Sequence, residues 1–175
     1  MRKPTLGELK ELVELLDDFN VCMLTTISQE GHLHSRPMAL QEPEEDMPLW
    51  LISSTTTSAG RHVAQRRELN IACYRSSDMA WISIAGVGEI DAERERIRRL
   101  WKDGWKTWFT EGPETPGIAI LKVQPISVTY WLPEQSRAGL LFEFLKSRFT
   151  HEYADVGPNR TFDLGKRDLQ AARRT

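Results

Sequence analysis

The 175-residue sequence has few cysteines and little net charge. Its two cysteines, Cys22 and Cys73, lack the Cys-x-x-Cys spacing of zinc and redox motifs, which argues against a disulfide framework or a zinc site. We expect both to be buried as small apolar residues, since free cysteines usually are. A net charge of −2 lacks the basic excess of polyanion-binding proteins, so nucleic acid is not an expected partner.

Long apolar segments and the common catalytic motifs are also missing. No run approaches the roughly 20 apolar residues of a membrane helix, and the amphipathic, acidic residues 1–19 do not resemble a signal peptide, so we expect a cytoplasmic protein. No G-x-S-x-G, Walker A or G-x-G-x-x-G motif follows a strand. His32 and His34 share one strand face but have no third ligand nearby, so we expect no metal site.

Apolar periodicity predicts a mainly β protein. Thr5 and Glu8 form a capping-box pattern before a helix whose apolar face runs from Leu9 to Phe19. Alternating or β-branched runs separated by short turns then predict strands at 21–28, 33–40, 49–53, 70–75 and 79–90, and a final strand pair at 118–125 and 126–133. Six or seven strands of this kind favour an antiparallel sheet closed into a barrel, with flanking helices.

Further helices are predicted at 62–69, 92–109 and 138–149. The helix over 92–109 would place Trp101, Trp105 and Trp108 on one face, either as core or as cover for a ring ligand or a second subunit. We interpret residues 1–135 as the barrel domain. Residues 136–175 are expected to be a helical extension of the same domain, followed by a polar tail that is poorly ordered.

Two features suggest a phosphate site. The hydroxyl-rich run from Ser53 to Ser58 precedes a helix with Arg61 in its first turn, and free N–H groups there favour an anion. A solvated loop with Ser58 as N-cap is the alternative. Arg36 stands before Pro37 in a strand that this proline marks as an edge or bulge, although an arginine alone in a strand usually faces solvent. His62 either assists a phosphate or faces water.

With these features in order, the chain resembles the pyridoxamine 5′-phosphate oxidase-like FMN-binding split barrels, and among them the general stress protein 26 branch. The resemblance covers about residues 9–131 and rests on MLTTISQEGHLHSRPM, LWLISS, ISIAGVGEI and LWKDGWKTWFTEGPETPG…ILKVQPISVTYW. It implies a mainly β, six- to seven-stranded antiparallel split barrel. It also implies a homodimer with FMN at the subunit interface.

The resemblance further implies a set of flavin-binding residues. Arg36, reaching the phosphate, would line the flavin with Pro37, Met38, Ala39, Leu40 and Gln41. Ser53 and Ser54 take the place of a hydroxyl pair, and Ser58, Gly60 and Arg61 that of the phosphate-binding turn. From the other subunit, Trp81 or Ser83, together with Trp105 or Trp108, would approach the ring.

The chain departs from true pyridoxamine phosphate oxidases, which have a lysine where Gln41 stands and end in an Arg-Leu-His-type segment. We therefore do not expect that oxidase activity, and no residue stands out as acid, base or nucleophile. The expected function is a low-specificity flavin oxidoreductase or a flavin-holding stress protein, its substrate and electron donor unassigned. The alternatives are a non-enzymatic dimeric interaction module, or the same barrel holding haem or a deazaflavin.

Overall fold

Seven antiparallel strands form one sheet. The computed structural model describes residues 2–44, 49–132, 159–165 and 168–174. The strands are β1 (Val21–Ile27), β2 (Leu33–Ala39), β3 (Trp50–Ser54), β4 (Glu68–Arg75), β5 (Ala80–Asp91), β6 (Ile118–Trp131) and β7 (Asn159–Asp163). They pair in the order β2-β1-β4-β5-β6-β3, and β7 adds to the far half of β6. The expected mainly β, antiparallel architecture is confirmed.

The sheet curls until its two end strands meet at one point. An isolated bridge joins Leu40, just after β2, to Leu51 in β3, and the Gln41 N–H donates to the Trp50 carbonyl at 3.3 Å. In the described part of the chain no other ladder joins β2 to β3. The barrel is therefore closed at one end of these strands and split at the other.

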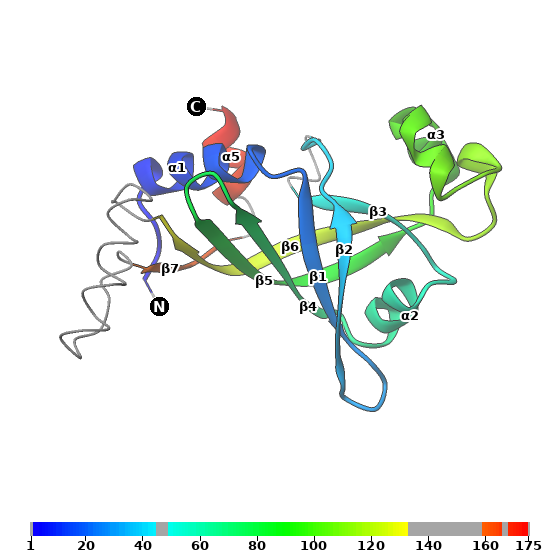
Figure 1. Cartoon of the computed structure of the whole chain (residues 1–175), viewed down its shortest axis with the longest axis horizontal. Helices are drawn as coiled ribbons and strands as arrows, with labels where there is room; N and C mark the ends of the chain where they lie inside the picture. Colours follow the sequence, from blue (N-terminus) through cyan, green and yellow to red (C-terminus); the bar gives the residue numbers. More distant parts are fainter. Residues whose placement is uncertain (1, 45–48, 133–158, 166–167, 175) are drawn as a thin grey trace.

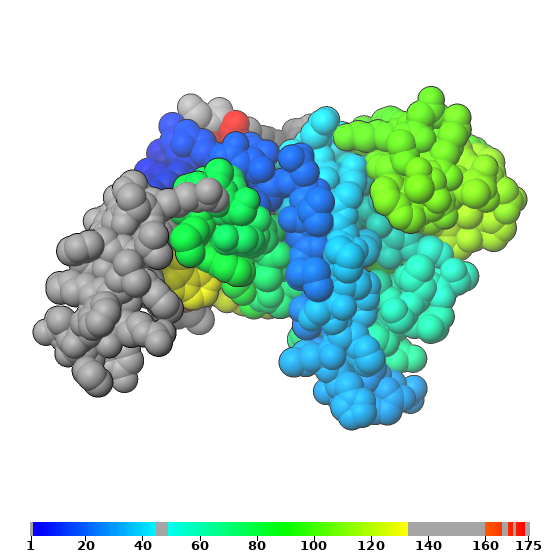
Figure 2. Space-filling model, viewed as in Figure 1, coloured from blue at the N-terminus to red at the C-terminus, as the bar shows by residue number. Residues whose placement is uncertain are grey.

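Helices cover the ends of the sheet (Figure 1). α1 (Leu6–Asp17) and α5 (Asp168–Arg174) pack together over one end, whereas α3 (Arg94–Leu100) and the 3₁₀ turns η1 (Asp103–Thr107) and η2 (Gly112–Glu114) lie at the other. α2 (Ser58–Gln65) lies beside the β1–β2 hairpin, which projects from the body of the molecule (Figure 2). Among the described residues, no helix is long and apolar enough to cross a membrane.

The apolar side chains form two clusters. The larger fills the barrel beneath α1 and contains both cysteines, whose burial raises their pKa values to about 12, as expected for inert interior thiols. The smaller packs α3 and η1 against the outer face of β3 and β6, with Trp50, Ile52 and Trp105 among its members. β3 is consequently buried along its whole length.

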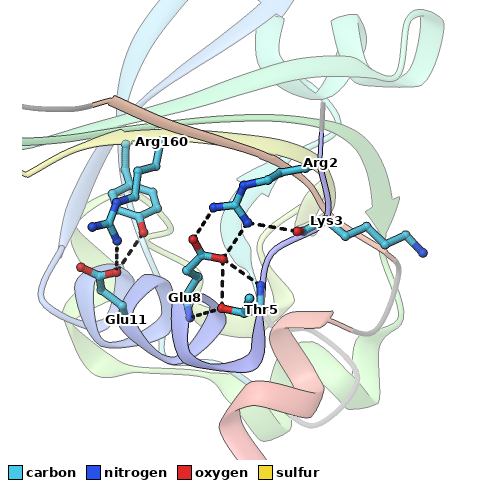
Figure 3. Close-up of polar contacts among 7 residues, drawn as sticks. Arg2, Lys3, Thr5, Glu8, Glu11 and Arg160 are labelled. Carbon is cyan, nitrogen blue, oxygen red and sulfur yellow. Dashed lines mark hydrogen bonds and ion pairs between the residues drawn. The ribbon is translucent and has the colours of Figure 1, made fainter.

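Polar contacts tie the ends of the described chain together (Figure 3). Arg2 binds Glu8, whose carboxylate also accepts from the Thr5 N–H at 2.8 Å and so completes the predicted capping box. Glu11 Oε2 accepts from the buried Tyr130 hydroxyl at 3.0 Å and from Arg160 Nη1 at 2.9 Å. The carboxylate of Glu11 in α1 thus joins β6 to β7.

Several predicted elements differ from those observed. The helix predicted over 92–109 is wrong, because α3 ends at Leu100 and Trp101 adopts an extended ψ of 133°. The pair predicted at 118–125 and 126–133 is one strand, β6, with a register shift at Ile126, between Pro125 opposite Gly86 and Ser127 opposite Ala85. The predicted helix at 138–149 lies outside the described residues. The sequence predicts no regular element in the polar tail, but residues 159–163 form β7 and residues 168–174 form α5.

Candidate functional site

A cavity of about 590 Å³ occupies the split between β2 and β3. Its walls come from the start of β1, the second half of β2, the end of β3, the start of α2 and the chain following η1. The lining residues are Val21, Arg36, Pro37, Met38, Ala39, Ile52, Ser53, Ser54, Thr57, Ala59, Trp108 and Phe109. A mostly apolar cavity of this size with a few polar groups in its wall is typical of a small-molecule site.

A fixed cation stands in the cavity wall. Arg36 is partly buried, and desolvation lowers its pKa. Its Nη1 donates to Thr26 Oγ1 at 2.8 Å, and the same hydroxyl lies 2.9 Å from His62 Nδ1. Because Thr26 is fully buried, it anchors Arg36 in the wall, so the arginine does not lie freely in solvent.

The start of α2 supplies backbone donors. The N-cap is Thr57, whose hydroxyl accepts from the Gly60 N–H at 3.2 Å; the alternative in which Ser58 caps the helix is therefore wrong. Ser58 and Ala59 lie in the first turn, where N–H groups have no acceptor inside the helix. Gly60 is required here because a Cβ would overlap the Ser54 carbonyl oxygen and lie 2.9 Å from Thr55 Cα.

The hydroxyl-rich run shapes the loop between β3 and α2. Ser54 Oγ lies 2.9 Å from Thr56 Oγ1, and the Thr57 hydroxyl donates to the Ser54 carbonyl at 2.8 Å. Ser53 and Ser54 are buried in the cavity wall, which contradicts the solvated-loop alternative for these two residues. Arg61 bonds to the Thr56 carbonyl and does not line the cavity.

The tryptophans after α3 have separate environments. Trp108 lines the cavity with 68% of its surface exposed, whereas Trp105 is buried in the smaller core. Trp105 packs edge-on against Trp50 and Trp101, with ring centroids 6.2 and 5.6 Å apart. The three indoles expected on one helix face therefore do not share a face, and among them only Trp108 lines the cavity.

The remaining predicted residues lie elsewhere. Leu40 and Gln41 border a smaller cavity of about 370 Å³ between the end of α1 and the start of β3. Trp81 stacks on Tyr74 at 4.1 Å, on the outer face of the sheet. Ser83, on the same face, accepts from Asn70 Nδ2 at 2.9 Å. Their contacts with a ligand remain predictions.

Sequence reasoning missed several wall residues, notably Val21, Thr26, Thr57 and Phe109. Thr57 had a usable signal, since a threonine directly before a helix is a favoured N-cap. Thr26 had no such signal, because nothing within its own strand sets this threonine apart. Its contact depends on the register that sets Leu24 opposite Arg36 and Thr26 opposite His34.

A split antiparallel barrel with a cavity between its end strands, lined by a partly buried arginine, hydroxyl groups and aromatic residues, defines a class of barrels with a small-molecule-sized site. Within that class, the chain belongs to the family described as pyridoxamine 5′-phosphate oxidase like, whose model matches residues 7–155. The resemblance drawn from the sequence is thereby confirmed.

Individual relatives are distant but span most of the chain. Protein bli-3 of Neurospora crassa is 24% identical over 177 residues, covering 95% of this chain and 83% of that protein. A putative general stress protein 26 from Jannaschia is 26% identical with a TM-score of 0.64, covering 91% of this chain and all of the other (100%). The general stress FMN/FAD binding protein of Xanthomonas citri is 25% identical with a TM-score of 0.62, covering 75% of this chain and 93% of that protein.

Proposed function

We propose that the protein is a cytoplasmic, homodimeric FMN-binding protein of the general stress type, acting as a low-specificity flavin oxidoreductase or as a flavin holder. The observation that carries the proposal is the cavity in the barrel split, whose wall combines Arg36, the first turn of α2 and Trp108. The similarity to a general stress FMN/FAD binding protein supports it.

The residues fit a phosphorylated flavin. Arg36 and the first turn of α2 form a donor set suited to a phosphate monoester, because charge-assisted bonds and helix N-termini both favour anions. The apolar wall of Val21, Met38 and Ile52 suits a flat ring, and Trp108 offers an aromatic face. A cavity of about 590 Å³ lies within the range of roughly 300–1,000 Å³ found for ligand sites.

The chain would contribute binding and orientation. Bound FMN supplies hydride or single-electron transfer. Among the lining residues that the structure describes, Arg36 is the only one with an ionisable side chain, so the wall holds no carboxylate or imidazole for proton transfer at a ring. This composition favours low substrate specificity or simple flavin holding. With Gln41 in place of lysine, we do not propose pyridoxamine phosphate oxidation.

An apolar outer sheet face supports the homodimer. Large apolar residues are exposed on the neighbouring strands β2, β1, β4 and β5. They are Leu33, Val21, Met23, Tyr74 and Trp81. Contiguous exposed apolar residues of this kind are typical of protein–protein interfaces. Val21 also lines the cavity, so this face continues into it. A second copy seated here would cover the cavity and bring its own Trp81 and Ser83 close to it.

The same face also favours a second candidate, a dimeric interaction module without cofactor. Molar mass and flavin content measured on one sample separate the two proposals. A dimer that neither carries nor takes up flavin would favour the module. The absorbance spectrum of the purified protein also distinguishes flavin from deazaflavin and haem.

The decisive experiment compares FMN with riboflavin, which lacks the phosphate, by flavin fluorescence titration. We expect Arg36→Gln to weaken FMN binding by about 1.5–3 kcal/mol, on the order of 10- to 100-fold, because a charged hydrogen bond to phosphate is lost. Riboflavin affinity should stay unchanged. The matched control is Arg99→Gln, which alters an exposed arginine that does not line the cavity. Equal losses for both ligands, or no FMN binding by the wild type, would overturn the proposal.

A further inference from the structure

A pair of histidines lies behind the arginine of the cavity. His62 in α2 and His34 in β2 have ring centroids 5.1 Å apart, where α2 packs on the β1–β2 hairpin (Figure 1). His62 Nδ1 lies 2.9 Å from the Thr26 hydroxyl that also receives the bond from Arg36. His62 is therefore one hydroxyl away from the guanidinium that the proposed function assigns to a phosphate.

The hydrogen-bond inventory of Thr26 connects the protonation of His62 to Arg36. Arg36 always donates, so it occupies one lone pair of Thr26 Oγ1. A neutral His62 can accept the hydroxyl hydrogen at Nδ1. The Thr26 hydroxyl then donates to His62 and accepts from Arg36, so both of its contacts are hydrogen bonds. A protonated His62 must donate, and the hydroxyl hydrogen of a fully buried residue then loses this acceptor. Without a ligand, this arrangement favours the neutral ring.

The charges around His62 act in the same direction. Arg61 lies on its own helix, Arg36 and His34 on β2, and Glu30 in the β1–β2 turn. Desolvation is the largest cause that lowers the pKa of His62. Electrostatic interactions with Arg36, His34 and Arg61 lower it further, while Glu30 raises it. The free protein thus keeps this imidazole neutral at pH values where an ordinary histidine is partly charged.

We propose that His62 takes up a proton when a phosphate group binds at Arg36 and the start of α2, so that FMN affinity is coupled to pH. The inference rests on the proposed function. Phosphate carries about −1.5 to −2 charges near pH 7 and offsets the cations that disfavour the imidazolium. The complex then holds a proton that the free protein lacks. Because the complex binds one more proton than the free protein, FMN affinity rises as pH falls through the range where His62 is charged in the complex and neutral in the free protein.

The test measures FMN dissociation constants from about pH 8 to about pH 6 in phosphate-free buffers, for wild type and His62→Gln. Glutamine keeps a group that can bond Thr26 but cannot titrate. Titration of the FMN phosphate itself affects both proteins equally, so the ratio of their constants isolates His62. We expect wild type to gain on the order of three- to tenfold in affinity relative to His62→Gln over this interval.

Matched measurements make the outcome specific. His32→Gln removes an exposed histidine from the same hairpin and should keep the wild-type pH profile. Riboflavin should show no difference between wild type and His62→Gln, which also verifies that the variant is folded. Calorimetry in two buffers of different ionisation enthalpy should show that wild type takes up more protons with FMN than His62→Gln does.

Parallel pH profiles for wild type and His62→Gln, or equal proton uptake by the two proteins, would overturn the coupling while leaving the proposed FMN site standing. Absence of FMN binding by wild type at every pH would overturn both.

Discussion

Gly60 allows α2 to begin directly against the end of β3. Any larger residue would place its Cβ against the Ser54 carbonyl oxygen and Thr55 Cα, and backbone atoms cannot move aside cheaply. The same approach brings the first turn of α2 to the cavity wall. The sequence resemblance marked this glycine as part of a phosphate-binding turn, and the structure supplies a packing reason for it.

We therefore expect Gly60→Ala to lower the free energy of unfolding by about 1–3 kcal/mol, measured by urea denaturation. Gly7 provides the control, because a Cβ there meets nothing within 4 Å in helix α1. Gly7→Ala should stabilise the protein by about 0.4–1 kcal/mol. Equal effects of the two substitutions would contradict the close approach at Gly60.

Glu8 makes the start of α1 sensitive to acid. The bond from Arg2, followed by that from the Thr5 N–H, lowers its pKa from 4.5 to about 2. A carboxylate with a lower pKa in the folded than in the unfolded state stabilises the fold above pH 4.5, and this contribution is lost as pH falls toward 2.

Glu8→Gln should therefore lose less stability than wild type between about pH 5 and pH 2, as measured by thermal unfolding. Glu14→Gln, which changes an exposed carboxylate on the same helix, should follow the wild-type profile. A Glu8→Gln curve parallel to wild type would contradict the role assigned to the Arg2–Glu8 contact.

The segment after α3 shows where local pattern and tertiary packing disagree. Its sequence favours one helix, apart from Gly104, which weakens helices. In the structure, the chain leaves helical geometry at Trp101, and Trp105 fits into the smaller core beside Trp50. The apolar surface against which Trp105 packs belongs to β3 and β6, which lie outside this segment. Periodicity along residues 92–109 therefore could not reveal it.

Trp105 and Trp108 should respond oppositely to substitution. We expect Trp105→Ala to cost about 3–5 kcal/mol of stability because it empties a buried site. Trp108→Ala should change stability by no more than about 0.5 kcal/mol, because the indole is exposed, yet weaken flavin binding. Urea denaturation and flavin titration of both variants provide the readouts. A large stability loss at Trp108 would contradict its placement in the cavity mouth.

For the molecule as a whole, the sequence predicted the antiparallel barrel but not the location of its opening. Alternating runs and short turns indicate which segments pair locally, such as β1 with β2 and β4 with β5. The bridge from Leu40 to Leu51 and the addition of β7 to β6 join segments whose order no local pattern encodes. The structure brings Arg36, Ser53 and Ser54 to one cavity. Residue type and the family resemblance both suggested a shared site, but only the resemblance carries information on segments far apart in the chain.

The proposed dimer predicts a specific change in mass. Wild type should have about twice the chain mass of 20.1 kDa by light scattering. Met23→Glu, in the middle of the exposed apolar face, should yield monomers because it would bury an unpaired charge at the interface. Leu6→Glu alters an equally exposed leucine on α1, away from that face, and should remain dimeric. Dimeric Met23→Glu would place the interface elsewhere.

The contacts of Glu11 set an order of assembly during synthesis on the ribosome. α1 is made before its partners Tyr130 and Arg160, which follow Glu11 by 119 and 149 residues. At typical elongation rates Arg160 is made on the order of 7–30 s after Glu11. A 12-residue helix is marginal alone in water, and α1 lacks its polar contacts to β6 and β7 through that interval. The nascent chain is thus most exposed to misassociation before β7 is complete.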